Sequence, residues 1–225
     1  MVCRWCRKEL KGSRRRDARF CDVKCRQAHH RFTRGRGVFT SLGDPIRVAY
    51  ADPPYPGRSR LYKGRSDYGG EVDFRALVLR LQLEYPHGWA LSTSSAGLAE
   101  VLRYCPPGVR IGAWFRGERP CKSSLPLVAW EPVVCFGGRV YPSTVDRRRV
   151  DALVHVHRPR RADPGQVIGS KPAAFCWWLF DLLGLRPGDE LADLFPGSGR
   201  VSYAFEEFGG KVFVPGPGDA SSTVG

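Results

Sequence analysis

The chain has 225 residues, 42% of them hydrophobic and six of them tryptophan, which is enough to bury one substantial core. Its formal net charge of +14 favours a polyanionic partner, because Lys and Arg side chains neutralise phosphates. No apolar run approaches the roughly 20 residues of a membrane span, and Met1 is not followed by the apolar segment of a secretory signal. We therefore expect a cytoplasmic protein with no membrane contact.

The first part of the chain, residues 1–36, combines clustered positive charge with paired cysteines. It holds thirteen Lys or Arg residues and three acidic ones. Thiolates in two close pairs can close a tetrahedron around zinc, and the metal would supply folding energy that so short a segment lacks. Disulfides are the alternative, which a reducing compartment disfavours. We predict a basic zinc-finger-like module at 1–36 with a structural zinc, whose ligands are Cys3, Cys6, Cys21 and Cys25.

Arginines surround these cysteine pairs, and guanidinium groups suit phosphate contact. His29 and His30 follow the second pair, so either could replace Cys25 as the fourth metal ligand. Residues 35–37 are expected to form a short flexible linker. The candidate nucleic-acid contacts in this module are Arg14, Arg15, Arg16, Arg19 and Arg26.

An apolar run at 46–51 predicts a buried strand, and the tetrapeptide Asp52-Pro53-Pro54-Tyr55 follows it directly. In open α/β sheets, ligands bind at the carboxyl ends of the strands. The two prolines lack N–H donors and hold the backbone with its carbonyls free to accept. Two acceptors beside an aromatic ring suit a planar group that carries an NH2, such as a nucleobase. An ordinary turn after a strand is the alternative interpretation.

The middle of the chain alternates between predicted strands and helices. A polar loop at 56–70 supplies three more candidate nucleic-acid contacts, Arg58, Arg60 and Lys63. The pattern then predicts a helix over 72–84, strands at 87–92, 109–115 and 132–136, and a helix between the first two of these strands. Ser170 is predicted to cap a further helix that ends at Gly184. This alternation favours an α/β fold with a mainly parallel sheet.

A second motif lies near the end of the chain. Residues 189–194 predict a short strand, and a small-residue turn with the sequence Phe-Pro-Gly-Ser-Gly joins it to an amphipathic helix that ends at Gly209. Glycines in such a turn let the backbone approach a ligand closely, and the helix start presents free N–H groups. Many such turns merely link a strand to a helix, but the presence of the earlier tetrapeptide strengthens the prediction of a binding site.

Together, the two motifs resemble those of the S-adenosylmethionine-dependent amino-methyltransferases that act on the exocyclic N6 amine of adenine. The resemblance covers about 44–214 and includes a Ser-Lys-Pro segment at 170–172. Its order, with the catalytic motif before the cofactor motif, is that of the permuted branch of the family. The resemblance implies a Rossmann-like α/β methyltransferase sheet at 44–214, which follows the small zinc-binding module. The small residues at 215–225 predict a flexible tail.

The resemblance also implies roles for individual residues. The catalytic set is Asp52, Pro53, Pro54 and Tyr55. The cofactor-binding set is Asp193, Phe195, Pro196, Gly197, Ser198, Gly199 and Lys171, the last through the carboxylate of S-adenosylmethionine. The implied substrate is adenine in DNA; alternatives are the cytosine N4 amine, adenine in RNA, or a catalytically silent zinc-finger DNA-binding protein. Two positions depart from the family pattern: Arg200 replaces a small hydroxyl residue, and Asp219 is the first acid after the strand at 211–214.

Overall fold

The computed structural model describes residues 43–57, 59, 70–118, 125–141, 149–156 and 170–215, together with Val23 and Arg26. The chain divides into two units, Met1–Asp44 and Pro45–Gly225. In the first unit, Val23 and Arg26 are helical and exposed. Several predicted site residues lie outside the described part of the chain: Cys3, Cys6, Cys21, Cys25, Arg14, Arg15, Arg16, Arg19, Arg58, Arg60 and Lys63.

The described part of the second unit contains a seven-stranded sheet with the order β5-β3-β4-β2-β1-β6-β7. Six strands run in one direction, and β4 is antiparallel to both of its neighbours. The prediction of an α/β fold with a mainly parallel sheet is therefore confirmed. The strands are β1 (Arg47–Ala51), β2 (Gly88–Ser92), β3 (Arg110–Phe115), β4 (Trp130–Gly137), β5 (Ala152–Val154), β6 (Glu190–Asp193) and β7 (Lys211–Phe213).

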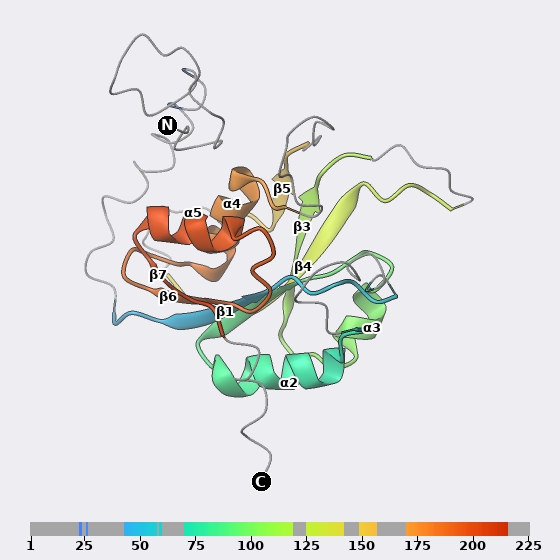
Figure 1. Cartoon of the computed structure of the whole chain (residues 1–225), viewed down its shortest axis with the longest axis horizontal. Helices are drawn as coiled ribbons and strands as arrows, with labels where there is room; N and C mark the ends of the chain where they lie inside the picture. Colours follow the sequence, from blue (N-terminus) through green and yellow to red (C-terminus); the bar gives the residue numbers. More distant parts are fainter. Residues whose placement is uncertain are drawn as a thin grey trace. The chain divides into compact units, whose positions relative to one another are not determined.

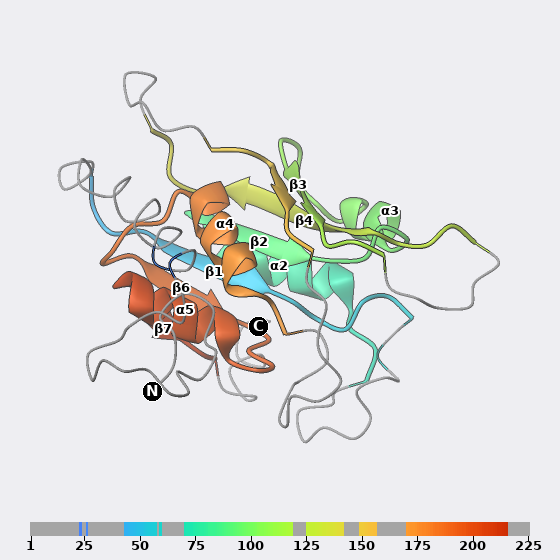
Figure 2. The same cartoon turned by 90° about the horizontal axis from the view of Figure 1, so that it is seen from above.

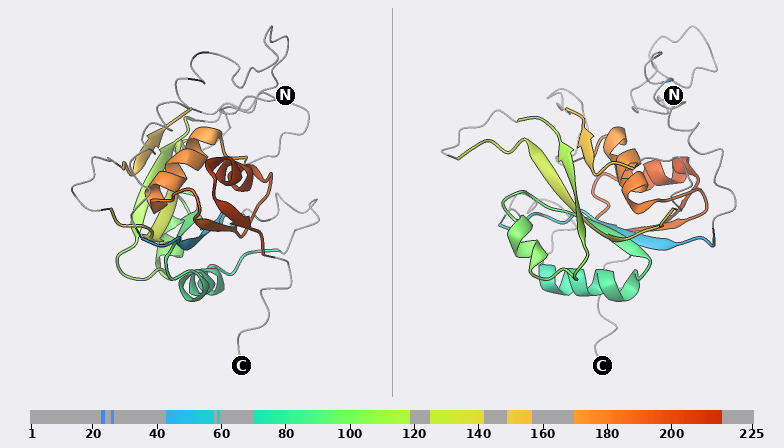
Figure 3. Two further views of the ribbon diagram at one scale, coloured as in Figure 1. Left: turned by 90° about the vertical axis from the view of Figure 1, so that its left-hand side faces the viewer. Right: turned by 180° about the vertical axis from the view of Figure 1, so that it is seen from behind.

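Helices cover both faces of this sheet (Figures 1 and 3). α2 (Phe74–Glu84) and α3 (Leu98–Leu102) lie on one face, whereas α4 (Ala173–Leu183) and α5 (Arg200–Phe208) lie on the other. The predicted glycine ends are confirmed, since Gly184 and Gly209 cap α4 and α5 in the left-handed conformation.

The prediction that Ser170 caps a helix is wrong. α4 begins at Ala173, and its N-cap position is occupied by Pro172 in an extended conformation, without a side-chain cap. A residue that precedes proline is disfavoured in the helical region, so Lys171 stays outside the helix and Ser170 is too far from its first turn.

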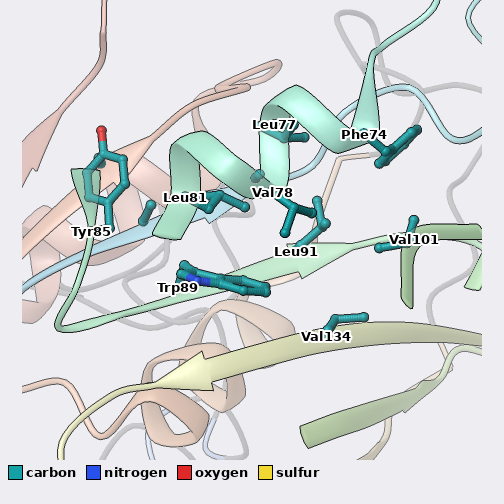
Figure 4. Packing of buried hydrophobic residues seen from close by; sticks show 12 residues of the cluster. Phe74, Leu77, Val78, Leu81, Tyr85, Trp89, Leu91, Val101 and Val134 are labelled. Carbon is teal, nitrogen blue, oxygen red and sulfur yellow. The ribbon is translucent and has the colours of Figure 1, made fainter. Parts of the chain in front are cut away.

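Two apolar layers hold the sheet between the helices. On one face, Val78 and Leu81 of α2 pack with Trp89 and Leu91 of β2 (Figure 4). On the other face, α4 is buried along most of its length and contributes an aromatic cluster, in which the Phe180 ring lies 4.9 Å from that of Phe205 in α5. Because both faces are covered, β1 and β2 are almost entirely apolar, as buried parallel strands require.

The order in which strands are added to the sheet reverses between β1 and β6, which are parallel neighbours. From β1 the chain passes through α2 to β2 on one side, and from β6 it passes through α5 to β7 on the other. Figure 2 shows α4 crossing over β1 and β2, with α2 behind them. In open α/β sheets, the crevice at the carboxyl ends of two such strands is where ligands bind.

Candidate active site

Asp52 is the first residue after β1 and lies at the carboxyl end of the central strands. Its side chain is 20% exposed, and its Oδ1 atom lies 3.0 Å from Nζ of Lys171. Burial raises the pKa of Asp52 to about 6; the Lys171 ammonium opposes this shift, and the Glu131 carboxylate adds to it. Asp52 is therefore a partly open carboxylate whose pKa lies above the usual range of an aspartate.

Lys171 lies at the centre of the site and is only 4% exposed. Besides Asp52, its Nζ atom contacts Oε1 of Glu131 and donates a hydrogen bond of 3.2 Å to the hydroxyl of Tyr55. Burial by itself would lower the pKa of Lys171, but the carboxylates of Asp52 and Glu131 outweigh it and raise the pKa above its usual value. The ammonium is therefore held in its charged form by two carboxylates.

Glu131 is a site residue that the sequence interpretation did not single out. It is the second residue of β4 and is 4% exposed. Because β4 runs against its neighbours, its first residues lie at the edge where β2 ends. One feature of the sequence does point to Glu131: it is a carboxylate at the start of an otherwise apolar strand. A buried acid needs a partner, so such a position indicates an ion pair.

The predicted cofactor motif begins with Asp193, the last residue of β6, which is 1% exposed. Its Oδ2 atom accepts a hydrogen bond of 2.6 Å from the hydroxyl of Ser202 in α5. Its Oδ1 atom is buried and has no hydrogen-bond partner within the described part of the chain. Burial raises the pKa of Asp193, whereas the Ser202 hydroxyl and the backbone N–H groups of Phe195 and Ser202 act in the opposite direction. The carboxylate is thus held by α5 and by the backbone of the turn, and its Oδ1 atom has no hydrogen bond of good geometry among the described residues.

The turn after β6 is shaped by two glycines with positive φ, Gly197 at 50° and Gly199 at 68°. A Cβ atom built on Gly199 would meet nothing within 4 Å, and one built on Gly197 would meet only the Phe195 carbonyl oxygen at 3.8 Å. Phe195 and Pro196 are half-buried. The backbone of this turn is thus open to close approach by another molecule.

One short segment connects the two predicted motifs. The hydroxyl of Ser170 lies 3.2 Å from that of Ser198 in the glycine turn, and the next residue, Lys171, contacts Asp52 and Tyr55. The structure therefore brings together the residues predicted for catalysis and those predicted for the cofactor, at the ends of the adjacent strands β1 and β6.

The predicted metal site lies outside the described residues, as do most of the predicted nucleic-acid contacts. In the part of the chain that is described, no group of three or more His, Cys, Asp or Glu side chains could hold a metal ion. No helix among those residues is both long and apolar enough to cross a membrane.

Neither a protein-family model nor a curated protein matches the sequence. Among solved structures, that of M1.HpyAVI is similar, with a TM-score of 0.51 and 13% identity over 78% of this chain and 84% of the other. The PvuII DNA methyltransferase, which is cytosine-N4-specific, gives a TM-score of 0.47 and 14% identity over 77% and 76%. TTHA0409, a putative DNA modification methylase from Thermus thermophilus, gives 0.47 and 15% over 83% and 88%. The similarity to M1.HpyAVI shows that the two chains share a fold.

Proposed function

We propose that this chain is an S-adenosylmethionine-dependent DNA methyltransferase that acts on the exocyclic amine of adenine. The observation that carries the proposal is the juxtaposition of Asp52 with the glycine turn at 197–199, at the ends of adjacent strands where this fold class binds ligands. M1.HpyAVI, whose fold the chain shares, has also been solved as a complex with SAM, which supports the choice of cofactor.

The residues of the turn fit that cofactor. The buried Oδ1 atom of Asp193 makes no hydrogen bond of good geometry within the described residues, and the missing side chains at Gly197 and Gly199 leave the backbone accessible. When bound, S-adenosylmethionine supplies a methyl group on a sulfonium, which is electrophilic without the help of a metal. The task of the protein is then to hold the two reactants and to prepare the amine.

An aromatic amine is a poor nucleophile because its lone pair is delocalised into the ring. We assign Asp52 and the Pro53 carbonyl to accept hydrogen bonds from the two N–H groups of the amine. These bonds favour a tetrahedral nitrogen and stabilise the positive charge that develops as the N–C bond forms. As this bond forms, the bond between the methyl group and sulfur would break and leave a neutral thioether, and the methylated nitrogen gives one proton to Asp52 or directly to water. Tyr55, fixed by the hydrogen bond from Lys171, stacks on the base, which must leave the helix in duplex DNA.

We assign the affinity for DNA to the basic residues of the chain, above all to the thirteen Lys or Arg residues at 1–36.

We assign Cys3, Cys6, Cys21 and Cys25 to one structural zinc that holds this module. Elemental analysis of protein purified without added metal should give about one zinc per chain, as four cysteine ligands bind one ion. We expect the zinc to be lost when Cys3 and Cys6 are both changed to Ser. Disulfides mapped between the two cysteine pairs would overturn this assignment.

The function is tested by incubating the protein with DNA and S-adenosylmethionine, digesting the DNA and quantifying the nucleosides by mass spectrometry. N6-methyladenine is the expected product, and Asp52→Ala protein is the control. N4-methylcytosine would replace the proposed substrate by cytosine, and a product formed only on RNA would replace DNA. Tight DNA binding without any methylated nucleoside would identify a catalytically silent DNA-binding protein.

A further inference from the structure

The contacts of Lys171 use all the hydrogen-bonding capacity of its ammonium group. Its Nζ atom has three N–H donors, and three oxygen atoms surround it, from Asp52, Tyr55 and Glu131. The remaining sides are closed by aromatic rings, since Nζ lies 5.2 Å from the ring centroid of Phe175 and 5.7 Å from that of Trp114. This arrangement leaves no donor for the carboxylate of a cofactor.

The two carboxylates in this cluster differ in exposure. The Glu131 side chain is 6% exposed, whereas that of Asp52 is 20% exposed, so Asp52 alone has a side open to a ligand. A buried ammonium without a counter-ion is costly. Because Glu131 is a second carboxylate in contact with Lys171, the ammonium keeps a partner when Asp52 is protonated or engaged by another donor. Asp52 is then free to hydrogen-bond with a substrate without leaving a buried charge unpaired.

We propose that Glu131 and Lys171 are positioning residues for the methyl transfer, with Lys171 fixing both Asp52 and Tyr55, and Glu131 fixing and neutralising Lys171. The proposal rests on the function proposed above and adds two residues to it. Neither residue touches the substrate. Each acts through Asp52 and Tyr55, whose correct placement decides whether the amine meets the methyl group in line.

The decisive measurement is the titration of Asp52 in the full-length protein, followed by NMR on aspartate labelled with carbon-13 at the carboxyl group. The groups that face Asp52 are Lys171, Glu131 and Asp193, with the buried phenol of Tyr50 nearby. Removing the positive charge in Lys171→Met should raise the pKa of Asp52. Removing the negative charge in the nearly isosteric Glu131→Gln should lower it. A merely structural disturbance would not produce two shifts of opposite sign.

The kinetic expectation follows from the same contacts. Both variants should lower kcat by about 100-fold, the cost of misplacing a reacting group by about 1 Å. The KM for S-adenosylmethionine should change by less than about threefold, because neither substitution removes a contact with the bound cofactor.

The matched control is another buried ion pair, that of Arg139 with Asp189, whose Nη2 and Oδ1 atoms lie 2.6 Å apart. Asp189 precedes β6, at the end of the strand opposite to Asp193. Arg139→Met should lower the melting temperature, but it should leave the pKa of Asp52 unchanged and keep kcat within about threefold of the unmodified protein.

Opposite shifts of the Asp52 pKa together with the loss of kcat support the proposal. An unchanged pKa and kcat in Glu131→Gln, or shifts of the same sign in both variants, would overturn it. If the unmodified protein methylates no nucleic acid, the proposed function fails, but the titration still decides whether Glu131 and Lys171 control Asp52. If Lys171→Met does not fold, the pKa of Asp52 is compared between Glu131→Gln and Arg139→Met. A lower pKa in Glu131→Gln supports the proposal, and an equal pKa overturns it.

Discussion

The ends of β1 and β6 are neighbours in the sheet, yet their side chains are organised in opposite ways. At the end of β1, Asp52 and Tyr55 lie in a crowded cluster where a buried ammonium contacts three oxygens. At the end of β6, the turn at 197–199 is open, with a buried oxygen of Asp193 that has no described partner. One end is filled by the protein itself, whereas the other has room for a second molecule.

This difference corresponds to two physical requirements. A group that stabilises charge in a transition state must be held in place before the reaction, because reorganising it would cost the energy that it supplies. A surface that binds a large cofactor must instead leave space and unused hydrogen-bonding groups. The contrast predicts that substitutions at the β1 end change the rate of the chemical step, whereas substitutions at the β6 end change cofactor affinity.

The largest effect is expected for Asp52→Ala. Loss of the carboxylate that accepts the amine hydrogen bond should lower kcat by about 1,000-fold, the upper range for removal of one such acceptor or donor. Lys171 keeps Glu131 as a partner, so the fold should survive. Single-turnover methyl transfer gives the rate, and calorimetric titration with S-adenosylmethionine should give a Kd within about threefold of the parent. Activity within a few-fold of the parent would remove Asp52 from the mechanism.

The activity should also depend on pH through the ionisation of Asp52. In the proposed mechanism the ionised form of Asp52 accepts the amine hydrogen bond and stabilises the developing positive charge, which the protonated form does much more weakly, and burial raises the pKa of Asp52 to about 6. The value of kcat/KM should therefore be constant above about pH 7 and fall about tenfold per pH unit well below pH 6. In Glu131→Gln the midpoint should move to lower pH. A profile that is flat down to pH 5 would contradict the assigned role of Asp52.

The substitution Gly199→Ala tests whether the open turn after β6 binds the cofactor. The φ of 68° makes any Cβ atom costly by about 1–2 kcal/mol, and the new methyl group would occupy space over the turn. We expect the Kd for the cofactor to rise about tenfold, which is about 1.4 kcal/mol, with kcat at saturation nearly unchanged.

The control for this change is Gly188→Ala, at the other end of β6, where φ is 90° and a Cβ atom also meets nothing within 4 Å. Both variants should melt at lower temperature, but only Gly199→Ala should bind the cofactor more weakly. Equal effects on the Kd would show that strain, and not the space over the turn, is responsible.

The smallest effect on chemistry is expected from the basic residues at 1–36. Changing Arg14, Arg15 and Arg16 together to Ala should weaken DNA binding, and should reduce the slope of log K against log salt by up to about 2.7. The kcat at saturating DNA and the sequence preference should stay the same. A changed preference would mean that these side chains contact bases, and an unchanged salt slope would mean that they do not contact phosphates.

The sequence predicted much of the scaffold and both ends of the site, because these depend on local patterns. The apolar run before Asp52 and the glycines of the turn at 197–199 identify strand ends and a tight turn wherever they occur. The contact of Glu131 with Lys171 could not be predicted, since it depends on the reversed direction of β4 and joins residues 40 positions apart. The start of α4, by contrast, depends on a local rule: Pro172 disfavours a helical conformation for Lys171, so Ser170 cannot be the cap.

The pairing of β1 with β6 also has a consequence for the order of folding. The contact of Ile46 with Asp189, beside these strands, spans 143 positions, so a long loop must close before β1 gains its second neighbour. Until then, β1 presents four apolar residues, Val48 to Ala51, on an unpaired edge that can associate with other chains. We expect the site to form late, and the main hazard for the nascent protein to be aggregation through β1, the strand that precedes Asp52.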